Sequence, residues 1–486
     1  MRGTKMTLAQ RSMTAMLWLT TAIVAVAQCE VGKLTAGDGA ADDRFGFSVA
    51  VDGDVAVIGA YGDDDLGGGA GAAYVFERFG GTWAEVAKLT AADGAAGDLF
   101  GGSVAVSGDV IAIGAFEDDD AGGHSGSAYV FQRAHYGNWL QVAKLLADDG
   151  DSYDLFGYSV AINGDVIVIG APEDEEQGYD SGSAYVFERD ANGDWVQAVK
   201  LLPDDGDYGD RFGHAVAIDG DVIVIGARDD EDLGNWSGSA YVFERSRNGN
   251  WSQVAKLLAD DGTVFDSFGE SVAIEGDTAL IGASRASGFG YHSGAAYVFQ
   301  RAQDGTWSQR AKLASLDGEN SDDFGYSVAL SADVALIGAR YDDDDGVHSG
   351  SAYVFVREDD ATWSQVAKLT ASDAAPDDWF GEAVSLSGNR AVIGAWGNDD
   401  YGTNSGSAYV FAVGPDEDAD GVMDACECPG DLNHDWIVDF LDLLVLLEDW
   451  GCNDPHNGCP GDCDLDGDTD HADLGLLLAN WGSVCP

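Results

Sequence analysis

The chain has 486 residues, of which 86 are acidic and 24 are basic, so its formal charge is −62. This excess of carboxylates excludes nucleic acids and anionic membranes as electrostatic partners, because phosphate groups are bound by clustered lysine and arginine. Hydrophobic residues make up 45% of the chain and include 13 tryptophans, which excludes disorder throughout and allows a substantial core.

The first 27 residues have the pattern of an export signal. Arg2, Lys5 and Arg11 precede an apolar stretch over residues 13–27, which ends in the small-residue cleavage pattern Ala25-Val26-Ala27. This stretch is too short to span a membrane comfortably, and no other segment is as apolar. We therefore expect residues 1–27 to be a signal peptide and the mature protein to be secreted or held at the cell surface, without a membrane span.

Seven Phe-Gly dipeptides recur along the chain at intervals of 55 or 56 residues. One tryptophan and one lysine recur in step with it in most copies. The phenylalanines are Phe45, Phe100, Phe156, Phe212, Phe268, Phe324 and Phe380. A fixed period of this length indicates either propeller blades or solenoid units.

Each copy contains four short runs of β-branched, aromatic and alanine residues separated by turn sequences. In the third copy these runs are residues 157–162, 166–170, 182–187 and 195–201. Four short strands per copy favour a propeller over a β-helix, whose turns are shorter. The last copy lacks its fourth strand, whereas residues 30–34 match a fourth strand and precede the first copy. We therefore predict an all-β, seven-bladed β-propeller over residues 28–413, with the N-terminal strand completing the last blade.

The acidic residues concentrate in two connections of each copy. Strands in a blade alternate in direction, so the connection between copies and the one between the second and third strands share one face. Together these connections contain 45 acidic residues and five arginines. Two interpretations stay open: the carboxylates keep an exported protein soluble, or they bind divalent cations. The run Asp118-Asp119-Asp120 lacks the alternating spacing of a compact cation cage, and the fifth copy has Ser284-Arg-Ala-Ser287 at this place.

Phe-Gly followed by Gly-Ala-x resembles the FG-GAP repeat of the integrin α-chain propeller. The third copy contains the full motif as Phe156-Gly157 and Gly170-Ala171-Pro172. The other copies keep Gly-Ala and vary the third residue, which is Tyr61, Phe116, Arg228, Ser284, Arg340 or Trp396. The resemblance covers residues 30 to 413 and implies an extracellular, non-enzymatic propeller that functions in adhesion or ligand binding.

Integrin-type repeats often have a calcium loop just before the Gly-Ala-Pro strand. The equivalent connection here is as short as Asn163-Gly164-Asp165. The calcium ligands of that family therefore have no counterpart in these blades.

An acidic segment over residues 414–427 follows the last repeat. Asp416, Asp418, Asp420 and Asp424 have the spacing of a thrombospondin-like calcium repeat. The same composition also fits a solvated linker, and both interpretations stay open.

Two 12-residue loops near the C-terminus have oxygen-bearing side chains at positions 1, 3, 5, 9 and 12, as in EF-hand calcium loops, with a backbone carbonyl at position 7. Each loop is followed by a short leucine-rich segment that ends in Trp-Gly. The first set of calcium ligands is Asp431, Asn433, Asp435, Ile437, Asp439 and Asp442. The second set is Asp462, Asp464, Asp466, Asp468, Asp470 and Asp473.

This pair of calcium loops, each with one helix, resembles a dockerin type I domain over residues 428–486. The resemblance implies that calcium is the bound cofactor and that the helices dock into a cohesin-like module on a scaffold or cell surface. Where that family often has a Ser/Thr pair for cohesin recognition, this chain has Phe440-Leu441 and His471-Ala472. Six of the seven cysteines lie in the last 61 residues of the chain, which suggests disulfides in an exported protein.

The sequence contains no motif that places a catalytic residue, and we predict no catalytic site. Our leading interpretation is a secreted calcium-binding protein whose propeller binds a glycan or protein ligand and whose dockerin-like module anchors it. The alternative from another class is a polysaccharide-binding or polysaccharide-degrading component of an extracellular complex. A third interpretation is a structural surface protein whose repeats act mainly as spacers.

Overall fold

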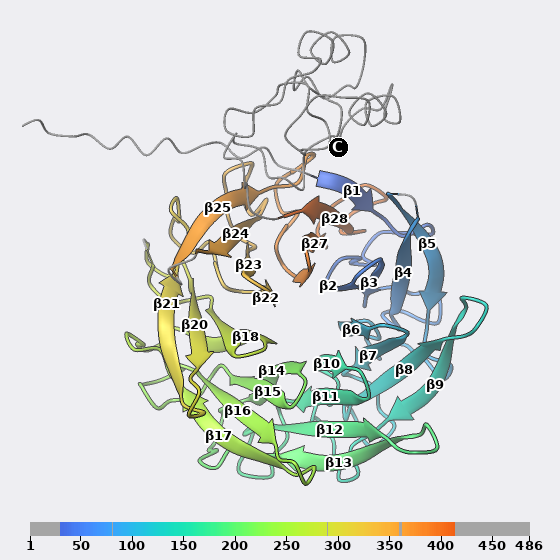
Figure 1. The fold of residues 1–486 in the computed structure, drawn as a ribbon. Coiled ribbons are helices and arrows are strands. Elements are labelled where there is room, and N and C mark those ends of the chain that lie inside the picture. Colours follow the sequence, from blue (N-terminus) through green and yellow to red (C-terminus); the bar gives the residue numbers. More distant parts are fainter. Residues whose placement is uncertain (1–29, 80, 289, 359–361, 414–486) are drawn as a thin grey trace, which may run out of the picture.

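The structure is a computed structural model that describes residues 30–79, 81–288, 290–358 and 362–413. The predictions of a signal peptide, an acidic linker and two C-terminal calcium loops lie outside the described residues. Within them, 28 strands form seven four-stranded antiparallel sheets arranged as blades around a central axis (Figure 1). The prediction of an all-β, seven-bladed propeller is confirmed.

We call the strands of each blade A, B, C and D, from the centre of the ring to its rim. Blades 1 to 3 consist of β2 (Ser48–Asp52), β3 (Val55–Ala60), β4 (Ala72–Phe79) and β5 (Thr82–Leu89); β6 (Ser103–Ser107), β7 (Val110–Ala115), β8 (Ser127–Arg133) and β9 (Trp139–Leu145); and β10 (Ser159–Asn163), β11 (Val166–Ala171), β12 (Ser183–Arg189) and β13 (Trp195–Leu201). Blades 4 and 5 consist of β14 (Phe212–Asp219), β15 (Val222–Ala227), β16 (Ser239–Arg245) and β17 (Trp251–Leu257); and β18 (Phe268–Glu275), β19 (Thr278–Ala283), β20 (Ala295–Arg301) and β21 (Trp307–Leu313). Blades 6 and 7 consist of β22 (Val328–Ser331), β23 (Val334–Ala339), β24 (Ser351–Arg357) and β25 (Trp363–Leu369); and β26 (Val384–Ser387), β27 (Arg390–Ala395), β28 (Ser407–Ala412) and β1 (Glu30–Leu34).

Blade 7 closes the ring as the sequence predicts. Its sheet order is β1-β28-β27-β26, so β1, the first of the described strands, is the D strand of the last blade. β1 pairs antiparallel with β28, with Lys33 opposite Tyr409 and Leu34 opposite Ala408. This pairing gives hydrogen-bond partners to the backbone groups along the edge of β28, which would otherwise be exposed.

The hydrophobic core lies between neighbouring blades. The cluster between blades 1 and 2, for example, contains Val57 and Val75 from one blade and Ile113 and Tyr129 from the next. Residues of the B and C strands are buried on both faces, which explains their continuous apolar sequence. Stability of the ring therefore depends on the contacts between blades.

The Phe-Gly motif forms these contacts. Phe156 is 1% exposed and packs edge-on against Tyr185, with ring centroids 5.3 Å apart. The following glycine, Gly157, has a φ of +93°, and a Cβ at this position would lie 2.3 Å from the carbonyl oxygen of Ser127 in the preceding blade. Only glycine allows this close approach, which explains its presence in every copy.

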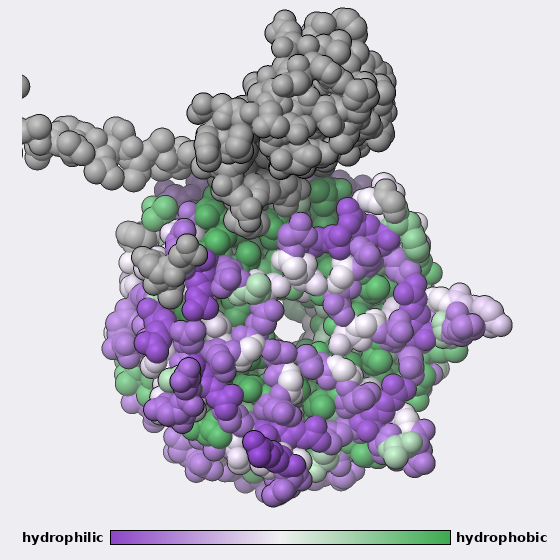
Figure 2. Space-filling view, in the orientation of Figure 1, coloured by the Kyte–Doolittle hydropathy of each residue, from purple (hydrophilic) through white to green (hydrophobic). Residues whose placement is uncertain are grey.

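The two ends of the disc differ in their connections. We call the end with the D–A and B–C connections the loop face, and the end with the A–B and C–D connections the turn face. A narrow opening passes through the centre of the ring (Figure 2). Because the A strands are innermost, the residues just before each A strand surround this opening on the loop face.

Candidate functional site

Carboxylates from both loop-face connections converge on the recurring lysine in six of the seven blades. In blade 4 the Nζ of Lys256 lies 2.9 Å from Asp205, 2.9 Å from Asp230 and 2.6 Å from Asp232. Asp205 comes from the D–A connection and the two other aspartates come from the B–C connection. We call this arrangement the lysine–carboxylate cluster. The equivalent lysines are Lys88, Lys144, Lys200, Lys368 and, for blade 7, Lys33.

The central carboxylate of the cluster is buried. Asp230 is 3% exposed and also accepts a hydrogen bond of 2.8 Å from the hydroxyl of Tyr241. Burial alone would lower the pKa of Lys256, but hydrogen bonds to the three aspartates outweigh it and raise the pKa. Burial alone would raise the pKa of Asp205, but its hydrogen bond with Lys256 outweighs this effect and lowers it. Each cluster is therefore a set of mutually stabilising ions.

This arrangement gives many of the loop carboxylates a partner within the blade. The ammonium group lies between the carboxylates of the two connections. Within the described ranges, no group of three or more histidine, cysteine, aspartate or glutamate side chains has a geometry that could hold a metal ion. Many of the blade carboxylates are thus ion-pair partners of a lysine.

Blade 5 is the exception, as its sequence indicates. Its lysine, Lys312, lies 2.7 Å from Asp261 and donates a longer bond of 3.3 Å to the carbonyl of Ser287. The B–C connection of this blade supplies no carboxylate to the lysine.

A second set of aspartates on this face is buried and faces backbone amides. Asp210 accepts a hydrogen bond of 2.7 Å from the amide of Asp207. Burial raises the pKa of Asp210 to about 7 and outweighs this hydrogen bond. Burial also raises the pKa of the equivalent residues to about 6 in Asp43, Asp154, Asp322 and Asp378.

The mouth of the central opening on the loop face is where the blades differ most. The residues directly after Phe-Gly and directly after Gly-Ala meet there. In blades 4 and 5, Nε2 of His214 lies 3.3 Å from Glu270, and Arg228 donates a bond of 3.0 Å to the same carboxylate. Burial alone would raise the pKa of Glu270, but the hydrogen bond with His214 and the charge of Arg228 lower it to about 2. Burial lowers the pKa of His214.

The mouth continues through blades 6 and 7 with a second glutamate. Arg340 lies 3.3 Å from Glu382 and 3.3 Å from Asp323, and its guanidinium stacks on the ring of Tyr326 at 3.5 Å. Burial raises the pKa of Glu382 and outweighs the charge of Arg340. The two buried glutamates of the mouth, Glu270 and Glu382, thus have pKa values shifted in opposite directions.

Backbone strain also gathers at this mouth. In all seven blades the residue before Phe-Gly is not glycine and yet has a φ of 54–58°. L-residues rarely adopt this left-handed conformation, and its recurrence in every blade makes it part of the repeating scaffold. They are Arg44, Leu99, Leu155, Arg211, Ser267, Asp323 and Trp379.

Exposed aromatic pairs join neighbouring blades farther out on the loop face. Tyr179 stacks on Tyr208 with ring centroids 5.7 Å apart, and Trp236 contacts Phe265 at 5.4 Å. Together with the stacked pair His124–Tyr153, these pairs occupy three consecutive blade junctions. Tyr208 is 69% exposed and Trp236 is 49% exposed, so aromatic surface is available to a ligand.

The mouth was not predicted as a site from the sequence. The signal was present, because the third residue of Gly-Ala-x varies between copies while its neighbours repeat. The predicted calcium ligands, from Asp431 to Asp473, and the weaker candidates Asp416, Asp418, Asp420 and Asp424 lie outside the described residues, so the structure does not place them.

Comparison with known proteins agrees with this geometry. The family model described as FG-GAP repeat matches residues 29–76, 83–131, 139–187, 195–243, 251–299, 307–355 and 363–411. The chain belongs to the FG-GAP repeat family. These FG-GAP matches run from the D strand of one blade to the C strand of the next, so the family unit bridges two blades.

Two individual similarities accompany the family match. The chain is 28% identical to integrin alpha-6 of Gallus gallus over 163 residues, which is 31% of this chain and 15% of that protein. It therefore spans only a small part of the curated relative that it matches. A crystal structure of a protein from Lactobacillus plantarum is similar over 69% of this chain and 86% of that chain, with 13% identity and a TM-score of 0.44. Among the described residues, no helix is long and apolar enough to cross a membrane.

Proposed function

We propose that this FG-GAP protein is a secreted, non-catalytic binding protein whose loop face binds a glycan or protein ligand in adhesion. One observation carries the proposal: the strands of the scaffold repeat almost unchanged, whereas on the loop face the mouth residues differ from blade to blade and exposed aromatic pairs occupy three consecutive junctions. Side chains that maintain a fold tend to repeat with the fold, so variation on one face favours recognition.

The loop face also limits the chemistry of the ligand. Its connections contain 45 acidic residues against five arginines, so a polyanion would be repelled. Aromatic rings next to carboxylates suit pyranose rings with hydroxyl groups, and they also suit cationic side chains. A neutral or positively charged ligand is therefore the class to expect.

This proposal is tested by measuring how the full chain binds to immobilised ligands. These are neutral, amine-bearing and acidic polysaccharides and extracellular matrix proteins. Trp236→Ala and Tyr208→Ala should each weaken binding to the selected ligand about tenfold. The matched control is Tyr136→Ala, because Tyr136 is 90% exposed but lies on the turn face. Equal effects of the three substitutions, or selective binding of acidic polymers, would contradict the proposal.

We also propose that the C-terminal module binds calcium and docks the protein to a cohesin-like or other surface scaffold. The spacing of both loops supports this part. Calorimetric titration of the full chain after chelation should give about two calcium sites. Asp473→Ala should remove one of them, whereas Asp118→Asn, in a lysine–carboxylate cluster, should leave both. Absence of stoichiometric calcium binding would refute the anchoring role.

A polysaccharide-degrading component is the second candidate, and a specific observation favours it. The channel mouth contains two buried glutamates, of which Glu382 has a raised pKa and Glu270 a lowered one, and unequal pKa values are one requirement of an acid and base pair in glycoside hydrolysis. In such a reaction Glu382 would donate the proton and Glu270 would act as the base. Release of reducing sugar that disappears in both Glu382→Gln and Glu270→Gln would support catalysis, and no release from any polysaccharide would leave binding as the function.

A further inference from the structure

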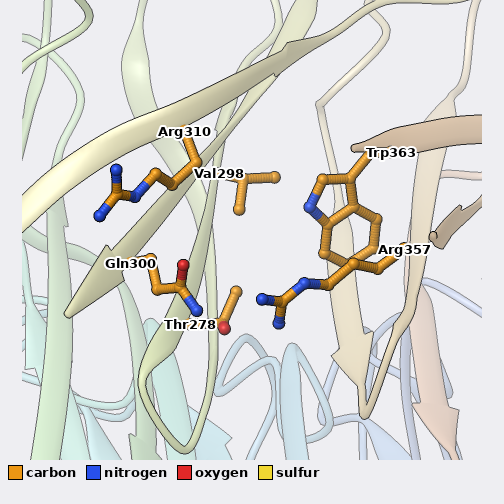
Figure 3. Close-up of a pocket in the computed structure, with 6 residues that line it drawn as sticks. All are labelled: Thr278, Val298, Gln300, Arg310, Arg357 and Trp363. Carbon is orange, nitrogen blue, oxygen red and sulfur yellow. The ribbon is translucent and has the colours of Figure 1, made fainter. Parts of the chain in front are cut away.

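A pocket on the turn face, remote from the loop face, lies at the junction of blades 5 and 6 (Figure 3). Its volume is about 220 Å³. Blade 5 contributes residues from β19, β20 and β21, and blade 6 contributes the end of β24 and the start of β25. The lining residues are Thr278, Val298, Gln300, Arg310, Arg357 and Trp363.

The other junctions show what is different here. At four of them the arginine that ends the C strand donates a hydrogen bond to a glutamate or glutamine of the preceding blade. Arg189 and Gln132, for example, are joined at 2.6 Å. The other three pairs are Arg133–Glu77, Arg245–Glu188 and Arg301–Glu244.

The junction of blades 5 and 6 has an arginine and a glutamine at the positions of Arg189 and Gln132. These residues are Arg357 and Gln300, and a pocket lies between them. No hydrogen bond joins these two side chains among the residues that the structure describes. Among the described residues, Arg357 forms an ion pair with Asp333, at 3.7 Å. In Figure 3 the guanidinium of Arg357 points toward Thr278, and the amide of Gln300 lies on the other side of this threonine. Donors that are paired at four junctions therefore line a pocket at this one.

A second guanidinium is placed at this pocket by a β-bulge. The register between the C and D strands shifts after Val298, which leaves Arg310 as the extra residue of β21. The same bulge occurs in blades 1 to 4 and 6, where the extra residue is Val86, Val142, Ala198, Val254 or Val366. Bulges re-aim side chains and are often found next to binding sites. Among these six D strands, only blade 5 has a cation at the bulge.

The third substitution adds a hydroxyl group. Thr278 begins β19, whereas the equivalent first residue of the B strand is valine in blades 1 to 4 and 6. These residues are Val55, Val110, Val166, Val222 and Val334. Three features of this junction thus depart from the repeat, and each supplies a polar donor to one pocket.

The combination of donors identifies a ligand class. Two guanidinium groups favour a carboxylate, which accepts paired hydrogen bonds from arginine. The hydroxyl of Thr278 and the amide of Gln300 suit sugar hydroxyl groups, and the indole of Trp363 offers a flat apolar surface to a pyranose ring. A volume below that of drug-sized pockets suits one monosaccharide. We propose that this pocket binds a single uronic acid residue, free or at the end of a glycan chain.

The charge of the whole chain supports a single acidic sugar over a polyanion. A formal charge of −62 repels a chain of carboxylates, whereas the local field of two arginines acts over the Debye length of about 8 Å at physiological ionic strength. This site is independent of the ligand proposed for the loop face.

Calorimetric titration of the full chain with glucuronic acid and with glucose tests the proposal. Glucuronic acid should bind at one site, and raising the salt concentration should weaken its binding, whereas glucose should bind at least tenfold more weakly. Arg310→Val and Thr278→Val restore the residues of the other blades, and Arg310→Val should raise Kd about tenfold or more. Arg310 is exposed, so its replacement should leave the thermal unfolding curve unchanged.

Blade 4 provides the matched control. Val254→Arg introduces the bulge arginine at a junction that stays closed by the Arg301–Glu244 pair, so it should create no second site. Equal binding of glucuronic acid and glucose, or unchanged affinity in Arg310→Val, would overturn the proposal. Equal competition by acetate would also overturn it, because the site would then recognise a carboxylate alone. Trp236→Ala, on the loop face, should leave glucuronic acid binding unchanged, which separates this site from the proposed ligand face.

Discussion

At the residue scale, the recurring lysine of each blade forms ion pairs with carboxylates of the acidic loops. Lys256 brings together carboxylates from connections that are separated by a whole strand pair, and the same geometry recurs in Lys88, Lys144, Lys200 and Lys368. A buried carboxylate without its counter-ion is costly, because desolvation is no longer offset by attraction. The lysines therefore stabilise the blade.

Replacing one of these lysines tests this role. Lys256→Met leaves the buried Asp230 without its cation, so the free energy of unfolding should fall by about 2–4 kcal/mol. Lys312→Met is the matched control, because Lys312 has one carboxylate partner, which is 53% exposed, and should cost less than about 1 kcal/mol. Denaturant unfolding of both variants measures the difference. Equal losses would show that the clusters do not contribute as described.

At the element scale, the strand that closes the ring, β1, contributes most to the integrity of the propeller. β1 comes from the start of the chain and yet completes the sheet formed by the last three strands. Leu34 is 3% exposed in the core between blades 7 and 1, and Lys33 lies 2.6 Å from Asp373. Without β1, the backbone groups of β28 would form a free edge for pairing with another chain.

Disruption of β1 should therefore destabilise the ring and promote association. The double variant Lys33→Pro, Leu34→Asp removes a backbone donor and introduces a charge into the core, so we expect a loss of about 3 kcal/mol or more. Size-exclusion chromatography and thermal unfolding measure the two effects. Gly32→Ser is the control, since nothing lies within 4 Å of an added Cβ there. A monomer with an unchanged melting temperature would contradict this account of closure.

At the scale of the whole molecule, buried aspartates make stability depend on pH. In the folded state burial raises the pKa of Asp210 to about 7 and that of Asp43 to about 6, so these carboxyl groups bind protons more tightly than in the unfolded chain. Their contribution to stability is present below pH 4 and is lost as the pH rises through 6 to 7. The lysine-bound aspartates, such as Asp205, have the opposite shift, and their contribution is lost as the pH falls below about 4.

The propeller should therefore have a higher melting temperature at pH 5 than at pH 8. Asp210→Asn keeps an oxygen for the amide of Asp207 and removes the charge, so it should raise the free energy of unfolding at pH 8 by about 1–4 kcal/mol. Its effect at pH 4 should be small. Thermal unfolding at constant ionic strength tests both statements, and a melting temperature that rises from pH 5 to pH 8 would contradict them.

The sequence was sufficient to predict the repeat, the four strands of a blade and closure by residues 30–34, because each of these is a periodic or complementary pattern along the chain. It could not show that Lys256 lies among three aspartates, since these come from two connections and meet only when the blade folds. For the same reason divalent cation binding by the blade loops stayed open as an interpretation. The pairing of His214 with Glu270, 56 residues apart, could not be predicted either. The variation of the third residue of Gly-Ala-x was the one signal in the sequence for the mouth.

Hydrogen exchange of the full chain with and without its selected ligand tests the central claim most directly. If the loop face binds the ligand, amides in the D–A and B–C connections around Tyr208 and Trp236 should be protected, while those of the A–B turns, such as Gly220, should exchange unchanged. Protection confined to the turn face or to the outer D strands would contradict the assignment of the loop face as the ligand-binding surface.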